Sequence, residues 1–289
     1  MPRKYVKIKI QHKRRWGVGL ERPIGVFDSG VGGLTVALEL MRQLPKEELI
    51  YVGDTLRCPY GSRPEEEVKQ FAFELVQFLL KKNVKMIVVA CNTATAFALE
   101  DLKKQLDIPI IGVIQPGARA AIKNTKNERI GIIGTEGTVR SEAYPKALKQ
   151  INQHLHVTSL ACPKFVPMVE KGITDGPEAR QVVEESLVPL KKQSNIDTLV
   201  LGCTHYPLLQ NVIQDVMGEH VKIISSGEET ARETSAILEM KNLLYTGTRK
   251  PKHSFYTTGD LEVFQRISKT IFKHAIDDLG NLTIEKVTL

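Results

Sequence analysis

Short apolar runs alternate along the chain with stretches in which apolar residues recur at helical spacing. The runs lie at residues 24–27, 49–52, 86–90 and 108–114. Between the second and third runs, apolar positions three and four residues apart predict a helix over residues 65–82. Pro64 stands near the position that proline favours at a helix start. This alternation of strands and helices is typical of a mostly parallel sheet covered by helices.

The same pattern returns further along the chain, which indicates an internal repeat. Residues 130–133, 161–163, 177–178, 198–202 and 221–224 match residues 24–27, 57–59, 64–65, 86–90 and 110–113, at offsets between 104 and 113 residues. Five matches in one order and at nearly one offset predict that the chain contains two similar α/β halves.

We therefore predict an α/β fold with two similar, flavodoxin-like parallel-sheet halves. A pseudo-twofold axis relates the halves, and the active site lies in the cleft between them. Residues 23–115 together with 225–289 are expected to form the first domain, and residues 116–224 the second. The C-terminal part is expected to contain helices around residues 229–244 and 260–279.

Composition narrows the class of protein. The chain has 289 residues, of which 42% are hydrophobic and 25% charged, which excludes a disordered chain, a collagen or a disulfide-rich miniprotein. No run approaches the roughly 18 consecutive apolar residues of a membrane-spanning helix, so we expect a soluble protein with no membrane partner. The four cysteines form no CxxC pair and no zinc-finger spacing, and we recognise no export signal. We therefore expect free thiols in a reducing cytoplasm.

The net charge of +7 is concentrated at the N-terminus. Residues 1–22 contain eight of the 40 basic residues and one of the 33 acidic residues, so the remainder contains 32 of each. The basic character therefore belongs to a short tail and gives little reason to expect nucleic-acid binding by the folded body. For the tail, a strand, a basic arm, a disordered appendage and a non-native extension remain open.

Small polar and nucleophilic residues follow the predicted strands. These groups are Asp28-Ser29-Gly30, Asp54-Thr55, Cys91-Asn92-Thr93, Gly134-Thr135 and Cys203-Thr204-His205. Ligands of open parallel sheets bind beyond the carboxyl ends of the strands, so we expect these groups to line one cleft. Each half contributes one cysteine at the matching position. Two thiols facing one carbon acid suit racemisation without a cofactor, because one thiolate removes a proton and the other thiol returns one to the opposite face.

A free cysteine is most often a small buried hydrophobe, so each thiol alone carries little weight. A cysteine that only fills space in the core is expected inside a strand. Cys91 and Cys203 instead each follow a predicted strand, where polar residues begin. The pair therefore favours function. Cys58 and Cys162 also match each other, but a proline follows each of them, and we interpret both as structural.

Five motifs resemble those of glutamate racemases, in the cofactor-independent aspartate/glutamate racemase superfamily. They are the segments Gly25–Leu34 (GVFDSGVGGL), Gly53–Thr55 (GDT), Cys58–Gly61 (CPYG), Ala90–Ala94 (ACNTA) and Leu201–Leu208 (LGCTHYPL). The resemblance extends over residues 22–280, and the tail is the one departure from the family pattern.

This resemblance implies a set of roles. Cys91 and Cys203 are expected to be the catalytic acid and base, with support from Asp28, Asp54, Glu170 and His205. The residues expected to bind substrate are Asp28, Ser29, Pro59, Tyr60, Gly61, Asn92, Thr93, Thr135, Thr138, Thr204 and His205. The resemblance further implies glutamate as substrate, no cofactor and no metal, a homodimer, and a supply of D-glutamate for peptidoglycan synthesis. Without the family resemblance, Asp54 would be interpreted as a residue that caps a turn, and Glu170 as an exposed acidic residue on the surface.

Three alternatives remain open. The same chemistry could act on aspartate. A thiol hydrolase or amidase would need only one cysteine together with His205, so that mutation of Cys91 and of Cys203 would have unequal effects. A non-catalytic protein with an amino-acid site could use the basic tail to engage an anionic partner, and deletion of residues 1–22 discriminates it from a racemase.

Overall fold

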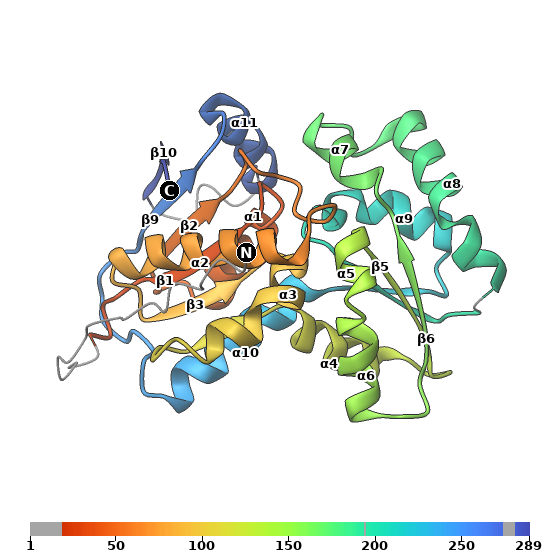
Figure 1. Cartoon of the computed structure of the whole chain (residues 1–289), viewed down its shortest axis with the longest axis horizontal. Coiled ribbons are helices and arrows are strands. Elements are labelled where there is room, and N and C mark those ends of the chain that lie inside the picture. Colours follow the sequence, from red (N-terminus) through yellow and green to blue (C-terminus); the bar gives the residue numbers. More distant parts are fainter. Residues whose placement is uncertain (1–18, 194, 274–280) are drawn as a thin grey trace, which may run out of the picture.

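The computed structural model of the chain describes residues 19–193, 195–273 and 281–289, and it contains two sheets covered by helices (Figure 1). The strands are β1 Ile24–Asp28, β2 Leu49–Gly53, β3 Met86–Val89, β4 Ile110–Gly112, β5 Arg129–Gly134, β6 His156–Ala161, β7 Thr198–Gly202, β8 Lys222–Ser225, β9 Lys252–Thr257 and β10 Asn281–Lys286. The helices are α1 Leu34–Gln43, α2 Glu65–Lys81, α3 Asn92–Lys103, α4 Ile114–Asn124, α5 Glu136–Arg140, α6 Ala143–Ile151, α7 Phe165–Glu170, α8 Gly176–Gln193, the 3₁₀-helix η1 Tyr206–Leu209, α9 Gln210–Met217, α10 Ser226–Met240 and α11 Leu261–Phe272.

Both sheets are parallel and share one strand order. The first runs β10-β9-β2-β1-β3-β4, and the second runs β6-β5-β7-β8. The inner order β2-β1-β3-β4 of the first sheet is thus the order of the second sheet, strand for strand. The predicted fold of two similar parallel-sheet halves is confirmed. The order is also that of the first four strands of a flavodoxin-like sheet.

The strands and helices are stabilised because their apolar side chains pack together in a buried core. Strands β1, β2, β3 and β7 are buried along their whole length, as expected for parallel strands covered on both faces. Helix α2 begins after Pro64 as predicted and turns Val68, Ala72 and Leu75 into the core above β1 and β3. Helix α10 packs against both α1 and α4, and so it joins the two halves, which lie side by side in Figure 1.

The C-terminal part differs from the sequence prediction. Helices α10 and α11 occupy the two predicted helical stretches, but the prediction missed β9 and β10, which extend the first sheet beyond β2. Strand β9 is rich in polar residues and carries no clear apolar alternation. It forms because β2 offers it a sheet edge, with Tyr51 opposite Phe255. Residues 1–18 of the basic tail and 274–279 of the second predicted helix lie outside the described residues.

The first sheet therefore takes its strands from both ends of the chain, and the second takes its strands from the middle. The domain boundaries suggested by the sequence stay a prediction. None of the helices within the described ranges is long and apolar enough to cross a bilayer.

A buried ion pair ties the two ends of the first half together. Lys85 Nζ lies 2.7 Å from Glu47 Oε2 and donates to the main-chain oxygens of Leu20 and Leu243 at 2.8 and 2.7 Å. The backbone N–H of Tyr245 donates to Glu47 at 2.8 Å. The side chains of Lys85 and Glu47 are 0% and 2% exposed, so each charge depends on the other for its stabilisation.

Replacing Glu47 with alanine is expected to lower the free energy of unfolding by about 3–5 kcal/mol, because the buried ammonium of Lys85 loses its partner. Urea unfolding measures the effect. Glu39→Ala is the matched control, since it breaks a partly exposed pair with Arg42 (3.0 Å) and should cost less than about 1 kcal/mol. Equal losses in both variants would contradict a special role for the buried pair.

Candidate active site

One pocket lies where the strand order of both halves reverses. Its lining comprises Ser29, Cys58, Pro59, Tyr60, Gly61, Cys91, Asn92, Thr93, Thr135, Val166, Cys203, Thr204 and His205. Most of these residues follow the carboxyl ends of β1, β2, β3, β5 and β7. Because parallel strands end at one edge of a sheet, the two halves bring their strand ends to the same pocket.

Cys91 lies at the first turn of α3. Its sulfur accepts a hydrogen bond from the backbone N–H of Ala94 at 3.4 Å and lies 3.5 Å from Ser29 Oγ. A helix start and a hydroxyl both favour a thiolate. Burial, followed by the charge of Asp28, outweighs them and raises the pKa of Cys91 to about 12. Cys91 is therefore a protonated thiol near neutral pH.

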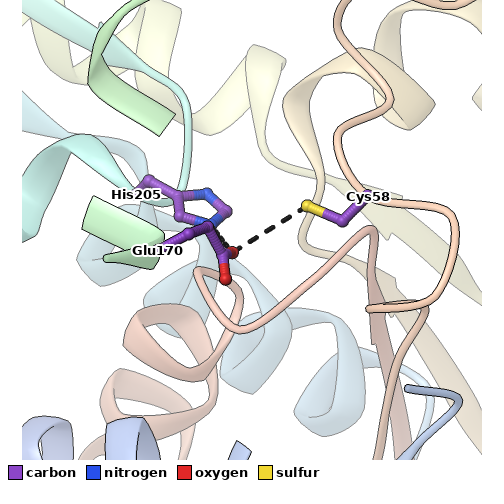
Figure 2. Close-up of side chains that lie close together, drawn as sticks. All are labelled: Cys58, Glu170 and His205. Atoms are coloured by element: carbon purple, nitrogen blue, oxygen red, sulfur yellow. Dashed lines mark hydrogen bonds and ion pairs between the residues drawn. The ribbon is translucent and has the colours of Figure 1, made fainter. Parts of the chain in front are cut away.

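Cys203 has a different neighbour. It follows β7, and its sulfur lies 3.9 Å from Nδ1 of His205. The other ring nitrogen of His205 lies 2.6 Å from Oε1 of Glu170, which ends α7 (Figure 2). Burial lowers the pKa of His205, but the hydrogen bonds with Cys203 and Glu170 outweigh it and raise that pKa to about 10. The ring is therefore protonated near neutral pH, and it presents a positive charge to the sulfur of Cys203.

Asp28 lies behind the pocket wall and contacts Thr204. Its carboxylate is completely buried, and both oxygens accept hydrogen bonds from the hydroxyl of Thr204 at 3.1 and 3.2 Å. Burial raises the pKa of Asp28, whereas His205 and Thr204 lower it. Asp28 thus holds the residue next to Cys203 and lies outside the pocket lining.

The glycine-rich loop after β1 packs closely against Thr204 and His205, the residues that follow Cys203. A Cβ atom at Gly32 would lie 2.5 Å from His205 Nδ1 and 2.6 Å from Thr204 Oγ1. A side chain at this position would therefore displace the groups beside Cys203. This close approach explains why glycine stands at this position.

Asp54 also lies behind the pocket. It accepts hydrogen bonds from the Tyr60 hydroxyl at 2.5 Å, from Arg57 Nε at 2.6 Å and from Thr258 Oγ1 at 2.8 Å. Burial, together with Asp54, raises the pKa of Tyr60, so its hydroxyl stays protonated and donates. These hydrogen bonds hold the loop that carries Pro59 in the pocket wall. The peptide bond between Cys58 and Pro59 is cis.

Three threonines connect the halves across the pocket. Thr93 Oγ1 lies 2.9 Å from Thr135 Oγ1 and 3.2 Å from Thr138 Oγ1. Next to them, the backbone N–H of Gly137 donates to the carbonyl oxygen of Gly61 at 2.7 Å. Thr138 is buried behind the other two and does not line the pocket.

Asn92 has an unpaired donor. Its Oδ1 accepts a hydrogen bond from the Tyr144 hydroxyl at 2.8 Å, while its buried Nδ2 has no partner among the described residues. An unpaired buried donor is costly, so this amide suits an anionic group of a ligand. Sequence reasoning missed Tyr144, because it belongs to α6 of the other half and no local pattern points to Asn92.

Most of the predicted site residues meet in this pocket. Those in its lining are Ser29, Pro59, Tyr60, Gly61, Cys91, Asn92, Thr93, Thr135, Cys203, Thr204 and His205, while Asp28, Asp54, Thr138 and Glu170 do not belong to the lining. The lining also includes Val166 and Cys58, which the sequence interpretation left as structural. Cys58, Glu170 and His205 together carry ligand atoms suited to a metal ion.

Known proteins share this architecture. The family described as Asp/Glu/Hydantoin racemase matches residues 33–234. A protein named glutamate racemase from Oceanobacillus iheyensis is 63% identical over 256 residues, which cover 89% of this chain and 93% of that protein. The crystal structure of glutamate racemase isoform RacE1 from Bacillus anthracis has a TM-score of 0.88 at 50% identity, covering 93% of this chain and 98% of that one. Glutamate racemase from Francisella tularensis, crystallised in complex with D-glutamate, has a TM-score of 0.84 at 33% identity, with the same coverage.

The match to the family spans most of the chain, from the glycine-rich loop after β1 into α10. The resemblance that the motifs indicate is therefore confirmed, and the chain belongs to the Asp/Glu/Hydantoin racemase family.

Proposed function

We propose that the protein is a glutamate racemase that interconverts L- and D-glutamate by a cofactor-independent, two-cysteine mechanism. The observation that carries this proposal is that Cys91 and Cys203, at equivalent strand ends of the two halves, line one pocket. Neighbouring thiols on either side of a bound amino acid can serve as base and acid on opposite faces of its α-carbon.

The reaction then balances in two proton transfers. One cysteine, as thiolate, takes the α-proton and leaves a carbanion conjugated with the substrate carboxylate. The other cysteine, as thiol, delivers its proton to the opposite face of the same carbon. The enzyme ends with the protonation states of the two sulfurs exchanged, and the reverse reaction uses them in exchanged roles.

The surroundings of the two sulfurs support such a pair. Burial keeps Cys91 protonated, whereas Cys203 lies beside the imidazolium of His205. The contacts of Cys91 with Ala94 N–H and Ser29 supply the donors that its own thiolate needs in the opposite direction.

Substrate carboxylates would be held by donors in the pocket wall. Asn92 Nδ2 is a buried donor without a partner among the described residues, and it lies at the start of α3, where backbone N–H groups also favour anions. Ser29, Thr93, Thr135, Thr204 and the segment Pro59–Gly61 are proposed to complete the substrate site, with Asp28, Asp54, Thr138 and Glu170 positioning them from behind. Donors at the α-carboxylate stabilise the charge that develops in the transition state.

Glutamate is favoured over aspartate because the similar proteins are named glutamate racemase and one was crystallised with D-glutamate. We further propose that D-glutamate supplies peptidoglycan synthesis and that the enzyme is a cytoplasmic homodimer. These last points follow from the family resemblance and from the unpaired cysteines.

One observation favours a second candidate. Cys203, His205 and Glu170 form a chain of contacts like that of a thiol hydrolase, with distances of 3.9 and 2.6 Å. A hydrolase of this kind would leave Cys91 without a role, so separate mutation of the two cysteines distinguishes the candidates.

Cys91→Ser and Cys203→Ser are each expected to reduce racemisation by about 10²–10⁴-fold, because each removes one proton carrier. Purified, reduced and EDTA-treated protein is incubated with L-glutamate in D₂O, and optical rotation is followed together with the α-proton NMR signal. Cys162→Ala, whose thiol lies outside the pocket lining, is the control. Near-parental racemisation by the Cys91 variant would contradict the two-cysteine mechanism, and parental failure to exchange the α-proton would refute the racemase.

Asn92→Ala is expected to reduce kcat/KM for glutamate by roughly 10- to 100-fold, since a hydrogen bond to a charged group contributes about 1.5–3 kcal/mol. Initial rates over a range of glutamate concentrations measure the loss. Asn211→Ala, on the exposed side of α9, is the matched control. An unchanged kcat/KM in the Asn92 variant would show that the unpaired amide does not contact substrate.

The raised pKa of His205 predicts a pH-dependent stability. Its folded-state pKa of about 10 exceeds its usual value of 6.5, so its stabilising contribution is fully present below about pH 6.5 and is lost as the pH rises towards 10. His205→Asn should therefore flatten the pH profile of the unfolding free energy over this window. The exposed His154→Asn variant should keep the parental profile, and a parental profile for His205→Asn would count against an imidazolium beside Cys203.

A further inference from the structure

The sulfur of Cys58 points towards Glu170, which in turn contacts His205 (Figure 2). Cys58 Sγ lies 3.9 Å from Glu170 Oε1, and the ligand atoms of all three residues lie within 4.8 Å of one another. Cys58 comes from the loop between β2 and α2 in the first half, whereas Glu170 and His205 come from α7 and the loop after β7. The cluster therefore bridges the two halves of the molecule.

These three ligand types select for a particular kind of metal. A thiolate, an imidazole and a carboxylate are the donors of zinc sites, and three protein ligands with an open fourth position are sufficient to hold Zn²⁺. Magnesium and calcium prefer oxygen ligands alone. The catalytic function proposed above uses no metal and assigns Cys58 no role.

The geometry lies within reach of a tetrahedral site. Zinc–ligand bonds of about 2.0–2.3 Å place ligand atoms roughly 3.3–3.6 Å apart. His205 Nε2 and Glu170 Oε1, now 2.6 Å apart, would separate by less than about 1 Å, and Cys58 Sγ, at 3.9 Å from that oxygen, would move inwards. Glu170 is 29% exposed and Cys58 is half-buried, so both side chains have room to adjust.

We propose that Zn²⁺ binds to Cys58, Glu170 and His205 and inhibits the enzyme reversibly. The protons of the thiol and of the His205–Glu170 contact leave to solvent as the metal binds. Cys58 and His205 both line the pocket, so the ion occupies the space between its two walls and joins the halves. It also breaks the contact between His205 and Glu170. The inhibitory part of this proposal rests on the proposed racemase function, whereas the metal site does not.

Metal binding is tested first, without reference to activity. Reduced, chelator-treated full-length protein is titrated with Co²⁺ as a spectroscopic probe and then with Zn²⁺ in competition. We expect one equivalent to bind with a thiolate-to-cobalt charge-transfer absorption, and Zn²⁺ to displace it. Cys58→Ala should lose this absorption and weaken Zn²⁺ binding at least about tenfold, while Cys162→Ala keeps both. Circular dichroism and melting curves establish that each variant is folded, and Cys58→Ser repeats the test with a poorer ligand.

Inhibition is then measured as the racemisation rate of each variant divided by its own zinc-free rate. We expect the Zn²⁺ concentration for half-inhibition to rise at least about tenfold in Cys58→Ala and to stay parental in Cys162→Ala. Parental inhibition of Cys58→Ala would overturn the proposal, since it places the metal on Cys91 or Cys203. Cys58-dependent binding without inhibition would overturn the inhibitory part. A cobalt signal that depends on Cys58 in a protein without racemase activity would refute the proposed function and leave the metal site standing.

Discussion

Parallel pairing of the strands is the constraint on which the rest of this structure depends. Every strand of a parallel sheet ends at the same edge, so residues that follow different strands gather there regardless of their separation in the chain. The reversal of strand order between β1 and β3, and between β5 and β7, opens a crevice at each edge. Two such crevices face each other, and Cys91 and Cys203 enter one pocket from equivalent positions.

Equivalent positions do not give the two cysteines equivalent chemistry. Cys91 lies against a helix start in a buried surrounding that favours its thiol, whereas Cys203 lies beside a protonated imidazole. A two-base racemase needs one acid and one base at the start of each turnover. The repeat thus supplies the two-sided arrangement, while the neighbours of the two sulfurs differ between the halves.

Much of the pattern could be predicted because it is local. Helix α2, seven of the first eight strands (all but β6) and the polar residues that follow several of them are visible in apolar spacing and in short motifs. Strands β9 and β10 could not be, because β9 contains several polar residues and is stabilised by pairing with β2. Tyr144 could not be predicted either, because its hydrogen bond to Asn92 joins residues that are far apart in the sequence.

Residue order along the chain was enough to establish the two-half α/β fold, the matched cysteines and the likeness to racemases, because these depend on periodicity, repetition and motif. It could not separate the residues that line the pocket from those that support it. Asp28 and Asp54 stand at strand ends as Ser29 does, yet packing turns their carboxylates towards Thr204 and Tyr60 behind the wall. Nor could it bring Cys58 opposite Glu170 and His205. Side-chain direction and contacts across the cleft arise when the two halves pack together, and no local pattern encodes them.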